Sequence, residues 1–184
     1  FKTRSGDTVS LQDVIDEAVT RATAVVEAKS PDMPAEEKAA VAKTVGIGAI
    51  KFAELSQNRM SDYIFDWEKM LALTGDTAPY LQNSYVRVRS IFRKIDGEFV
   101  APQRLTINED AEIHLARMLV RYAEVVPSTL DDCRPNLLAA YLYDLARAFH
   151  SFYEACPVLK SEGAVKENNT FSANFHKQFQ EKPY

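Results

Sequence analysis

The sequence predicts an all-α protein, a helical bundle, and three observations support this fold class. Apolar residues recur three and four positions apart over most of the 184 residues, which is the period of helices that bury one face. A β-prone run is confined to residues 63–65. Prolines and short polar residues separate the periodic stretches at positions where helices commonly begin or end. A chain of this length can bury one good core.

The first two helices are expected over residues 10–28 and 34–56. Ser10 precedes the first periodic stretch and Asp13 follows three residues later, which is a variant of the capping box. Pro34 is followed by acidic residues, and this combination suits the first turn of a helix. We therefore expect both helices to have well-defined starts.

Two glycines interrupt the second of these helices. Gly46 and Gly48 each cost about 1 kcal/mol relative to alanine in a helix interior. Their proximity predicts either a kink or a close approach of another backbone. No strand precedes the Gly-Ile-Gly run, so it does not qualify as a phosphate-binding loop.

The middle of the chain is expected to hold a short helix, a turn and a long helix. Asp66 is placed to cap a helix over residues 67–73, in which Trp67 anchors the segment to the bundle. Residues 74–77 predict a turn that ends in the N-cap of a helix over residues 78–95.

The helix over residues 78–95 has two contrasting faces. Its apolar residues form one stripe at helical spacing: Leu81, Tyr85, Val88, Phe92 and Ile95. The opposite face holds two polar groups, which are Gln82, Arg89 and Arg93 on one side and Asn83, Arg87 and Lys94 on the other. Residues 80–104 carry five Lys/Arg against two Asp/Glu in a chain of net charge -4. Such a basic patch suggests a polyanionic partner, most commonly nucleic acid, with a solvated charged face as the alternative.

Two further helices are expected, over residues 109–126 and 136–155. Pro127 is expected to stop the first and Pro157 to end the second. The inward face of the last helix is a strong apolar stripe: Leu138, Tyr141, Leu142, Leu145, Phe149 and Phe152.

Several classes of protein fit the sequence poorly. No run approaches about 18 consecutive apolar residues, so we expect no membrane span. Cys133 and Cys156 match no zinc-binding spacing, so they are expected to be reduced, structural thiols and no metal is expected. His114 and His150 are expected to be surface or packing residues. No nucleophile–base constellation is apparent, which argues against a small enzyme working from a pocket.

Four segments of the chain, in order, resemble class I arginyl-tRNA synthetases of the bacterial type. They read FKTRSGDTVSL, VGIGAIKFAELSQNRMSDYIFDWEKML, LTGDTAPYLQNSYVRVRSIFRK and YLYDLARAFHSFYEACPVL. Four ordered blocks are far more specific than one short motif. The resemblance implies the C-terminal region of such an enzyme, with the helical DALR anticodon-binding domain. A Rossmann half that performs the nucleotide chemistry would be missing.

The resemblance implies three parts in this chain. Residues 1–56 would be the end of the catalytic domain, with a mobile-loop remnant and connecting helices. Residues 57–160 would form the DALR-type anticodon-binding bundle, and residues 161–184 a divergent tail that is expected to be disordered. The chain begins without a methionine, which suggests a fragment.

The resemblance also implies the activity of the full-length enzyme. That enzyme would activate arginine with ATP and Mg and esterify it to tRNA(Arg), as a monomer in the cytoplasm. The fragment alone would bind tRNA and no cofactor, since it lacks the catalytic half. The alternative is a catalytically inactive helical module that binds tRNA or another protein.

The basic face then has an implied role in binding the anticodon stem-loop. Cations would contact phosphates, a tyrosine would stack on a base, and amides would read a base edge. The residues expected to bind tRNA are Tyr80, Gln82, Asn83, Arg87, Arg89, Arg93 and Lys94. Tyr85 lies on the apolar stripe, so core packing is its favoured role. Asp144 and Arg147, in the DALR-like run, are expected to pair on the helix surface.

Lys2, Arg4 and Ser5 stand where the mobile loop of class I synthetases carries Lys-Met-Ser-Lys-Ser. By resemblance, Lys2 or Arg4 would stabilise the triphosphate during adenylate formation. A frayed terminus is the favoured alternative for an isolated fragment. The tail departs from the family, because no Leu, Ile, Val or Met follows Val165.

Overall fold

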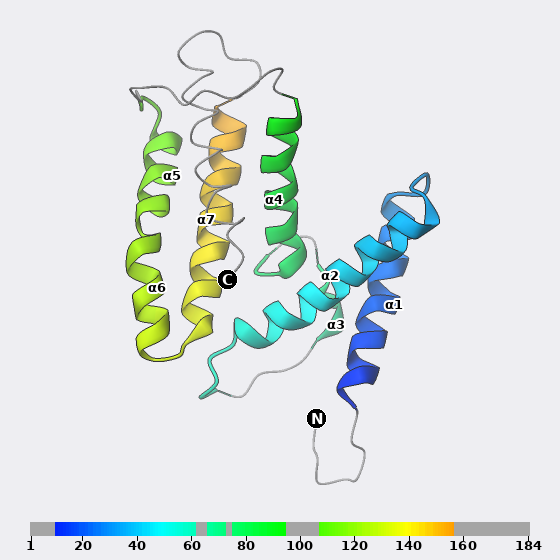
Figure 1. Cartoon of the computed structure of the whole chain (residues 1–184). Helices are drawn as coiled ribbons and strands as arrows, with labels where there is room; N and C mark the ends of the chain where they lie inside the picture. Colours follow the sequence, from blue (N-terminus) through cyan, green and yellow to red (C-terminus); the bar gives the residue numbers. More distant parts are fainter. Residues whose placement is uncertain (1–9, 62–65, 73–74, 95–106, 157–184) are drawn as a thin grey trace. The chain divides into compact units, whose positions relative to one another are not determined.

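The structure is a computed structural model, and it describes residues 10–61, 66–72, 75–94 and 107–156. Helices dominate these residues and no strand occurs among them (Figure 1), which confirms the all-α prediction. The described residues fall into two compact units, divided between Pro79 and Tyr80. The domain bounds expected at residues 56 and 160 stay a prediction. No helix in the described ranges has the length and apolar character that crossing a membrane would require.

The first unit contains α1 (Leu11–Lys29), α2 (Ala35–Leu55) and the short α3 (Trp67–Met70). The start of α1 is the predicted capping box. The Ser10 hydroxyl accepts a hydrogen bond from the Asp13 N–H at 3.1 Å, and the Asp13 carboxylate accepts one from the Ser10 N–H at 3.2 Å. Two backbone donors at the helix start are thereby satisfied.

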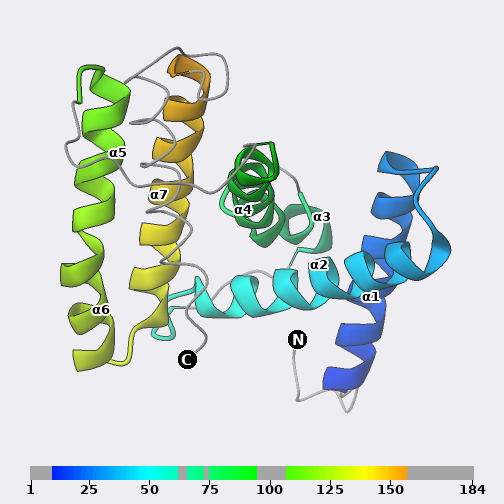
Figure 2. The same ribbon diagram turned by 45° about the horizontal axis from the view of Figure 1, so that its top comes forward.

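The helices α1 and α2 cross with their backbones almost in contact. A Cβ atom placed on Gly46 would lie 2.9 Å from backbone atoms of Ala18 and Val19. The buried residues around this crossing are small: Ala18, Ala22, Ala42, Gly46 and Ala49. Figure 2 shows α2 running unbroken past α1. The close approach predicted from the two glycines is therefore confirmed at Gly46.

The helix α3 is held at its start by Asp66, as predicted. The Asp66 carboxylate accepts hydrogen bonds from two N–H groups of the first turn, at 2.9 and 3.1 Å. The helix ends at Met70, earlier than the expected residue 73. Trp67 is half-buried against the hydrophobic cluster of this unit, and the Arg21 guanidinium lies 5.3 Å above its ring. Trp67 therefore anchors its segment within the first unit, and the β-prone run at residues 63–65 lies outside the described residues.

The turn before α4 (Ala78–Arg93) uses a glycine where the backbone requires one. Gly75 has a φ of 81°, a left-handed conformation that strains other residues. Thr77 is buried, and its hydroxyl donates a hydrogen bond to the Ala72 carbonyl at 2.7 Å. This bond joins described residues on either side of the predicted turn, of which residue 74 lies outside the described residues.

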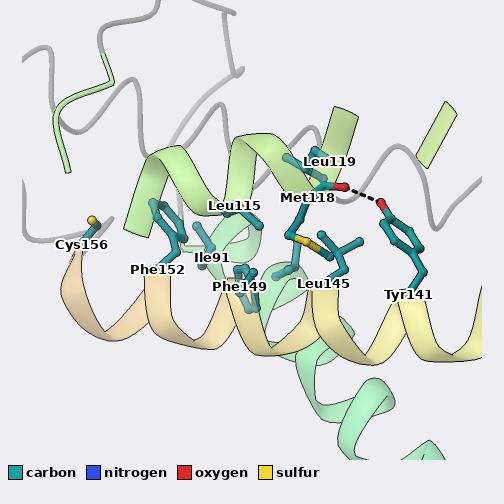
Figure 3. Close-up of a cluster of buried hydrophobic side chains, with 11 residues drawn as sticks. Ile91, Leu115, Met118, Leu119, Tyr141, Leu145, Phe149, Phe152 and Cys156 are labelled. Atoms are coloured by element: carbon teal, nitrogen blue, oxygen red, sulfur yellow. Dashed lines mark hydrogen bonds between the residues drawn. The ribbon is translucent and has the colours of Figure 1, made fainter. Parts of the chain in front are cut away.

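The second unit is built around α7 (Pro135–Ala155). Figures 1 and 2 show α5 (Asp110–Val120) and α6 (Tyr122–Asp131) along one side of α7, and α4 along the other. The core between these helices is aliphatic and aromatic (Figure 3): Val88, Ile91, Leu115, Met118, Leu119, Tyr141, Leu145, Ala148, Phe149, Phe152 and Cys156. The stripe predicted for the last helix is confirmed, although Leu138 and Leu142 are only partly buried.

The buried face of α4 is rotated from the predicted stripe. Its deepest residues are Ser84, Val88 and Ile91, each at most 1% exposed. Tyr85 is only half-buried, at the edge of this face. The rotation has a physical reason, since Ser84 can be buried once its hydroxyl has hydrogen-bond partners on α7 and on its own helix.

The single helix expected over residues 109–126 is wrong. The chain breaks at Arg121 into α5 and α6, and α6 continues through Pro127. A proline inside a helix removes one backbone donor. Here both Pro127 and Ala123, whose carbonyl loses its helical partner, are exposed. Water can solvate that carbonyl, so the helix tolerates the proline.

Tyr141 fastens α7 to α5. Its hydroxyl donates a hydrogen bond to the Met118 carbonyl at 2.8 Å (Figure 3). Burial raises the pKa of Tyr141 to about 12, so the donor keeps its proton at neutral pH.

The two cysteines differ in setting. Cys133 is exposed, whereas Cys156 is buried and burial raises the pKa of its thiol.

Candidate nucleic-acid interface

The residues predicted to bind tRNA lie on α4 or directly after it, and they fall on two flanks of the helix. Successive residues turn by about 100°, so Arg87 and Arg89 point about 160° apart. The flank of Arg87 lies next to α7, because the Arg87 guanidinium and the Tyr80 ring both contact α7 side chains. By register this flank holds Tyr80, Asn83, Arg87 and Lys94, and the other holds Gln82, Arg89 and Arg93.

None of these predicted residues is fully buried. Asn83, Arg93 and Lys94 are exposed. The others are half-buried, namely Tyr80, Gln82, Arg87 and Arg89. The mobile-loop residues Lys2, Arg4 and Ser5 lie outside the described residues. The assignment of these side chains to tRNA contacts stays a prediction.

Tyr80 is part of an aromatic surface shared by α4 and α7. Its ring centroid lies 5.5 Å from that of Tyr143 and 4.9 Å from that of His150, with tilted planes. These separations are typical of favourable aromatic pairs. Tyr80 and Tyr143 are each half-buried, so part of each ring stays accessible. The start of α4 therefore carries a half-buried ring in contact with two others.

Two arginines flank these rings. The Arg87 guanidinium lies 5.8 Å from the ring centroid of Tyr153, and that of Arg147 lies 5.9 Å from the centroid of Tyr143. Both separations fall within the range of cation–π contacts. We call this set of six residues the aromatic–arginine cluster: Tyr80, Arg87, Tyr143, Arg147, His150 and Tyr153. It combines faces on which a base can stack with cations that attract phosphate.

A hydrogen bond beneath the cluster joins the two helices. Ser84 Oγ lies 2.8 Å from His150 Nε2, and the Ser84 hydroxyl also donates to the Tyr80 carbonyl at 3.1 Å. A hydroxyl has one proton, so this arrangement requires His150 to donate from Nε2. The bond fixes the orientation of the imidazole against the Tyr80 ring.

The titration of His150 reflects this setting. Burial, and then repulsion from Arg87, lower the pKa of His150, while Glu154 acts in the opposite direction. The ring is therefore neutral at pH 7. Burial likewise raises the pKa of Tyr80, with Tyr143 as the second cause. At neutral pH the cluster thus places the neutral rings of Tyr80 and His150 beside the guanidinium of Arg87.

Sequence reasoning missed most of the contribution of α7. Tyr143, His150 and Tyr153 were not among the predicted contacts. Their signal was available, since Tyr143, Arg147 and His150 are spaced four and three residues apart on one face of the last helix. The expected pair of Asp144 and Arg147 is absent, because no ion pair within 4.0 Å joins them among the described residues. Arg147 lies over the Tyr143 ring instead.

Two family models match the chain, and they cover different parts of it. Residues 1–67 match the catalytic domain of class I tRNA synthetases (R), and residues 81–172 match the DALR anticodon binding domain. The second match covers half of the chain. It includes α5, α6 and α7, most of α4, and every residue of the aromatic–arginine cluster except Tyr80.

Curated relatives and solved structures agree with these models. The chain is 56% identical over 166 residues to the arginine–tRNA ligase of Laribacter hongkongensis, covering 90% of this chain and 29% of the relative. It is 50% identical over 171 residues to that of Escherichia coli, covering 92% of this chain and 30% of the relative. The chain thus spans about three tenths of the length of the relatives it matches.

The fold matches that of arginyl-tRNA synthetases from distant organisms. The Thermus thermophilus enzyme aligns with a TM-score of 0.83 at 32% identity, over 93% of this chain and 30% of its own. The Plasmodium falciparum enzyme aligns with a TM-score of 0.84 at 26% identity, over 93% of this chain and 31% of its own. These matches confirm the resemblance inferred from the four sequence segments. The chain therefore belongs to the DALR anticodon-binding domain family, in the form found in arginine–tRNA ligases.

Proposed function

We propose that this chain is the tRNA-binding part of an arginine–tRNA ligase and that its aromatic–arginine cluster receives the anticodon loop. The observation that carries the proposal is the Tyr80 ring, which is supported by Tyr143 and His150 and left partly accessible. Bases splayed from a single-stranded loop stack on such rings. Each stack contributes about 1–3 kcal/mol.

The cations beside the rings suit the phosphates of the same loop. Arg87 and Arg147 both keep their charge at any physiological pH. A guanidinium can also form paired hydrogen bonds to a phosphate. Asn83 is exposed on the same flank of α4 and offers both a donor and an acceptor to a base edge. The cluster therefore supplies stacking, charge and edge recognition in one place.

The proposal extends to the full-length enzyme. That enzyme would activate arginine with ATP and Mg and transfer it to tRNA(Arg), using a catalytic half outside this chain. Residues 1–56 would connect to that half, residues 57–160 would form the anticodon-binding bundle, and residues 161–184 a divergent tail. We expect the protein to act as a monomer in the cytoplasm.

The proposal is tested by titrating the chain with a fluorescent hairpin that carries the tRNA(Arg) anticodon loop. Replacing Tyr80 by leucine removes the stacking face, so the dissociation constant should rise about 5- to 150-fold. The Tyr80→Phe variant keeps the ring and should bind within a few-fold of the wild type. Equal binding by the leucine variant would exclude Tyr80 as a stacking platform.

A matched pair of arginines tests which flank of α4 faces the RNA. Arg87→Gln should weaken binding and reduce the dependence of log affinity on log salt, because one phosphate contact is lost. Arg89→Gln makes the same change on the opposite flank and should have the smaller effect. The reverse order would move the interface away from α7. It would then favour the second predicted group, Gln82, Arg89 and Arg93.

A further inference from the structure

A second polar surface lies in the groove between α5 and α7, away from α4. The groove has a volume of about 320 Å³. From α5 it is lined by His114, Met118 and Arg121, which are four and three residues apart and so share one face of the helix. The first and last of these are exposed, and Met118 forms the buried floor.

The α7 wall of the groove carries the matching polar residues. Asp144, Arg147 and Ser151 line it and are exposed, with the buried Ala148 between them. Two guanidinium groups face one carboxylate, so the formal charge of the groove is positive. Neither Arg121 nor Arg147 forms an ion pair within 4.0 Å among the described residues. Their charge is therefore available to a ligand.

The floor and one wall of the groove are held in place. The Tyr141 hydroxyl donates to the Met118 carbonyl at 2.8 Å, which fixes the end of α5 against α7. The Arg121 guanidinium lies 3.6 Å from the Met118 sulfur. Arg121 also occupies the break between α5 and α6, where its N–H still donates to the Arg117 carbonyl at 3.2 Å. The arginine is thus positioned over the floor before any ligand binds.

Arg147 connects this groove with the aromatic–arginine cluster. It lines the groove, and its guanidinium also lies 5.9 Å from the centroid of Tyr143. Tyr143 in turn supports Tyr80. An RNA strand whose base stacks on the cluster therefore passes beside a positively charged groove on the next face of α7.

We propose that the groove between α5 and α7 binds a phosphodiester group of the RNA backbone. Arg121 and Arg147 supply the charge, and His114 and Ser151 supply hydrogen-bond donors. The carboxylate of Asp144 leaves the groove with one net positive charge, which matches a single phosphodiester anion. This inference rests on the proposed function, because the RNA whose backbone is bound is the anticodon hairpin of that proposal.

The first test measures the salt dependence of hairpin binding by Arg121→Gln in the full chain. Loss of one phosphate contact should reduce the slope of log affinity against log salt by about 0.7–0.9. Arg121→Lys keeps the charge and should retain the slope. Arg134→Gln makes the same change in the same unit outside the groove and should leave the slope unchanged. A wild-type slope in Arg121→Gln would overturn the proposal.

The second test separates this inference from the proposed function. Inorganic phosphate is titrated into the chain without RNA, and the amide NMR signals of Arg121 and Ser151 are followed. Saturable shifts in the wild type that vanish in Arg121→Gln support an anion site in the groove. Shifts that do not saturate, or that persist in the variant, overturn it. Phosphate binding combined with an unchanged RNA salt slope also overturns the backbone assignment.

The two failures remain distinguishable. Should Tyr80→Leu bind the hairpin normally while Arg121→Gln loses salt dependence, the cluster is wrong and the groove stands. Should Tyr80→Leu weaken binding while Arg121→Gln behaves as the wild type, the groove is wrong and the cluster stands.

Discussion

The two units of the molecule are built on opposite packing rules. At the crossing of α1 and α2 the first unit packs over alanines and a glycine, and at Gly46 the two backbones lie too close to leave room for a Cβ atom. The second unit closes over large side chains, of which Phe149 and Phe152 are completely buried. Small residues allow helices to approach closely, and they cannot be shortened enough to leave a large cavity. Large residues fill space between helices, and their loss leaves a cavity.

The comparison also explains where the candidate interface lies. The helix α7 is rich in aromatic residues, and those that face the core hold it in place. Others on the same helix, Tyr143 and Tyr153, lie outside the core and form part of the aromatic–arginine cluster. The helix that carries the largest buried rings thus also carries the half-buried and exposed rings of the cluster.

The largest expected effect comes from removing a ring from the second unit. Phe149→Ala should lower the free energy of unfolding by about 3–5 kcal/mol, because the cavity cannot collapse fully. Circular dichroism in urea would measure the loss. Trp67, the single tryptophan of the chain, reports on the first unit by fluorescence. If the Trp67 fluorescence transition shifted as far as the circular dichroism transition, the two units would unfold together. Their packing could then not be compared separately.

A smaller effect is expected from adding one methyl group to the first unit. Gly46→Ala places a Cβ atom 2.9 Å from the Ala18 backbone, which cannot move aside as a side chain can. Overpacking costs about 1–3 kcal/mol, and the higher helix propensity of alanine offsets about 1 kcal/mol of that. The fluorescence transition of Trp67 should therefore shift to lower urea.

The control for this variant lies three residues away. Lys43 is exposed on the same helix, so Lys43→Ala should change stability by less than about 0.5 kcal/mol. A Gly46→Ala protein more stable than the wild type would mean that α1 and α2 have room to separate. The packing rule assigned to the first unit would then be wrong.

The smallest expected effect is a pH dependence of stability that only the second unit should show. The pKa of His150 is lowered in the folded chain, chiefly by burial, so the unfolded chain binds the proton more tightly. The contribution of His150 to stability is therefore constant above its unfolded pKa of about 6.5 and is lost as the pH falls below it. His150→Gln should reduce the loss between about pH 7 and pH 5.

The first unit provides the internal control for this titration. No histidine occurs in residues 1–79, so the Trp67 transition should lack this component. Denaturation curves of wild type and His150→Gln at several pH values would compare the two. If the free energy of unfolding depended on pH in the same way for both proteins, protonation of His150 would not destabilise the folded chain.

The sequence was sufficient where structure is decided locally. The capping box at Ser10, the cap at Asp66 and the apolar stripe of α7 depend on residues a few positions apart. Each of them was predicted correctly. The pair Gly46 and Gly48 predicted either a kink or a close approach of another backbone, and the structure shows the close approach at Gly46.

The sequence was insufficient where the structure depends on contacts with residues far away in the chain. Periodicity places Tyr80 and Arg87 on one flank of α4. It does not predict that Tyr143 and His150 of α7 lie beside this flank. The helix end expected at residue 126 is wrong because Pro127 is tolerated inside α6, where it is exposed. The break at Arg121 interrupts a stretch whose apolar period predicts one continuous helix. The burial of Ser84 was missed because its hydrogen-bond partner, His150, is 66 positions away in the sequence.

The crossing at Gly46 has a mechanical consequence. A joint made of side chains can absorb rotation by switching rotamers. At Gly46 no side chain of α2 stands between the two helices, so a rotation of one against the other would have to be accommodated by moving the backbones apart.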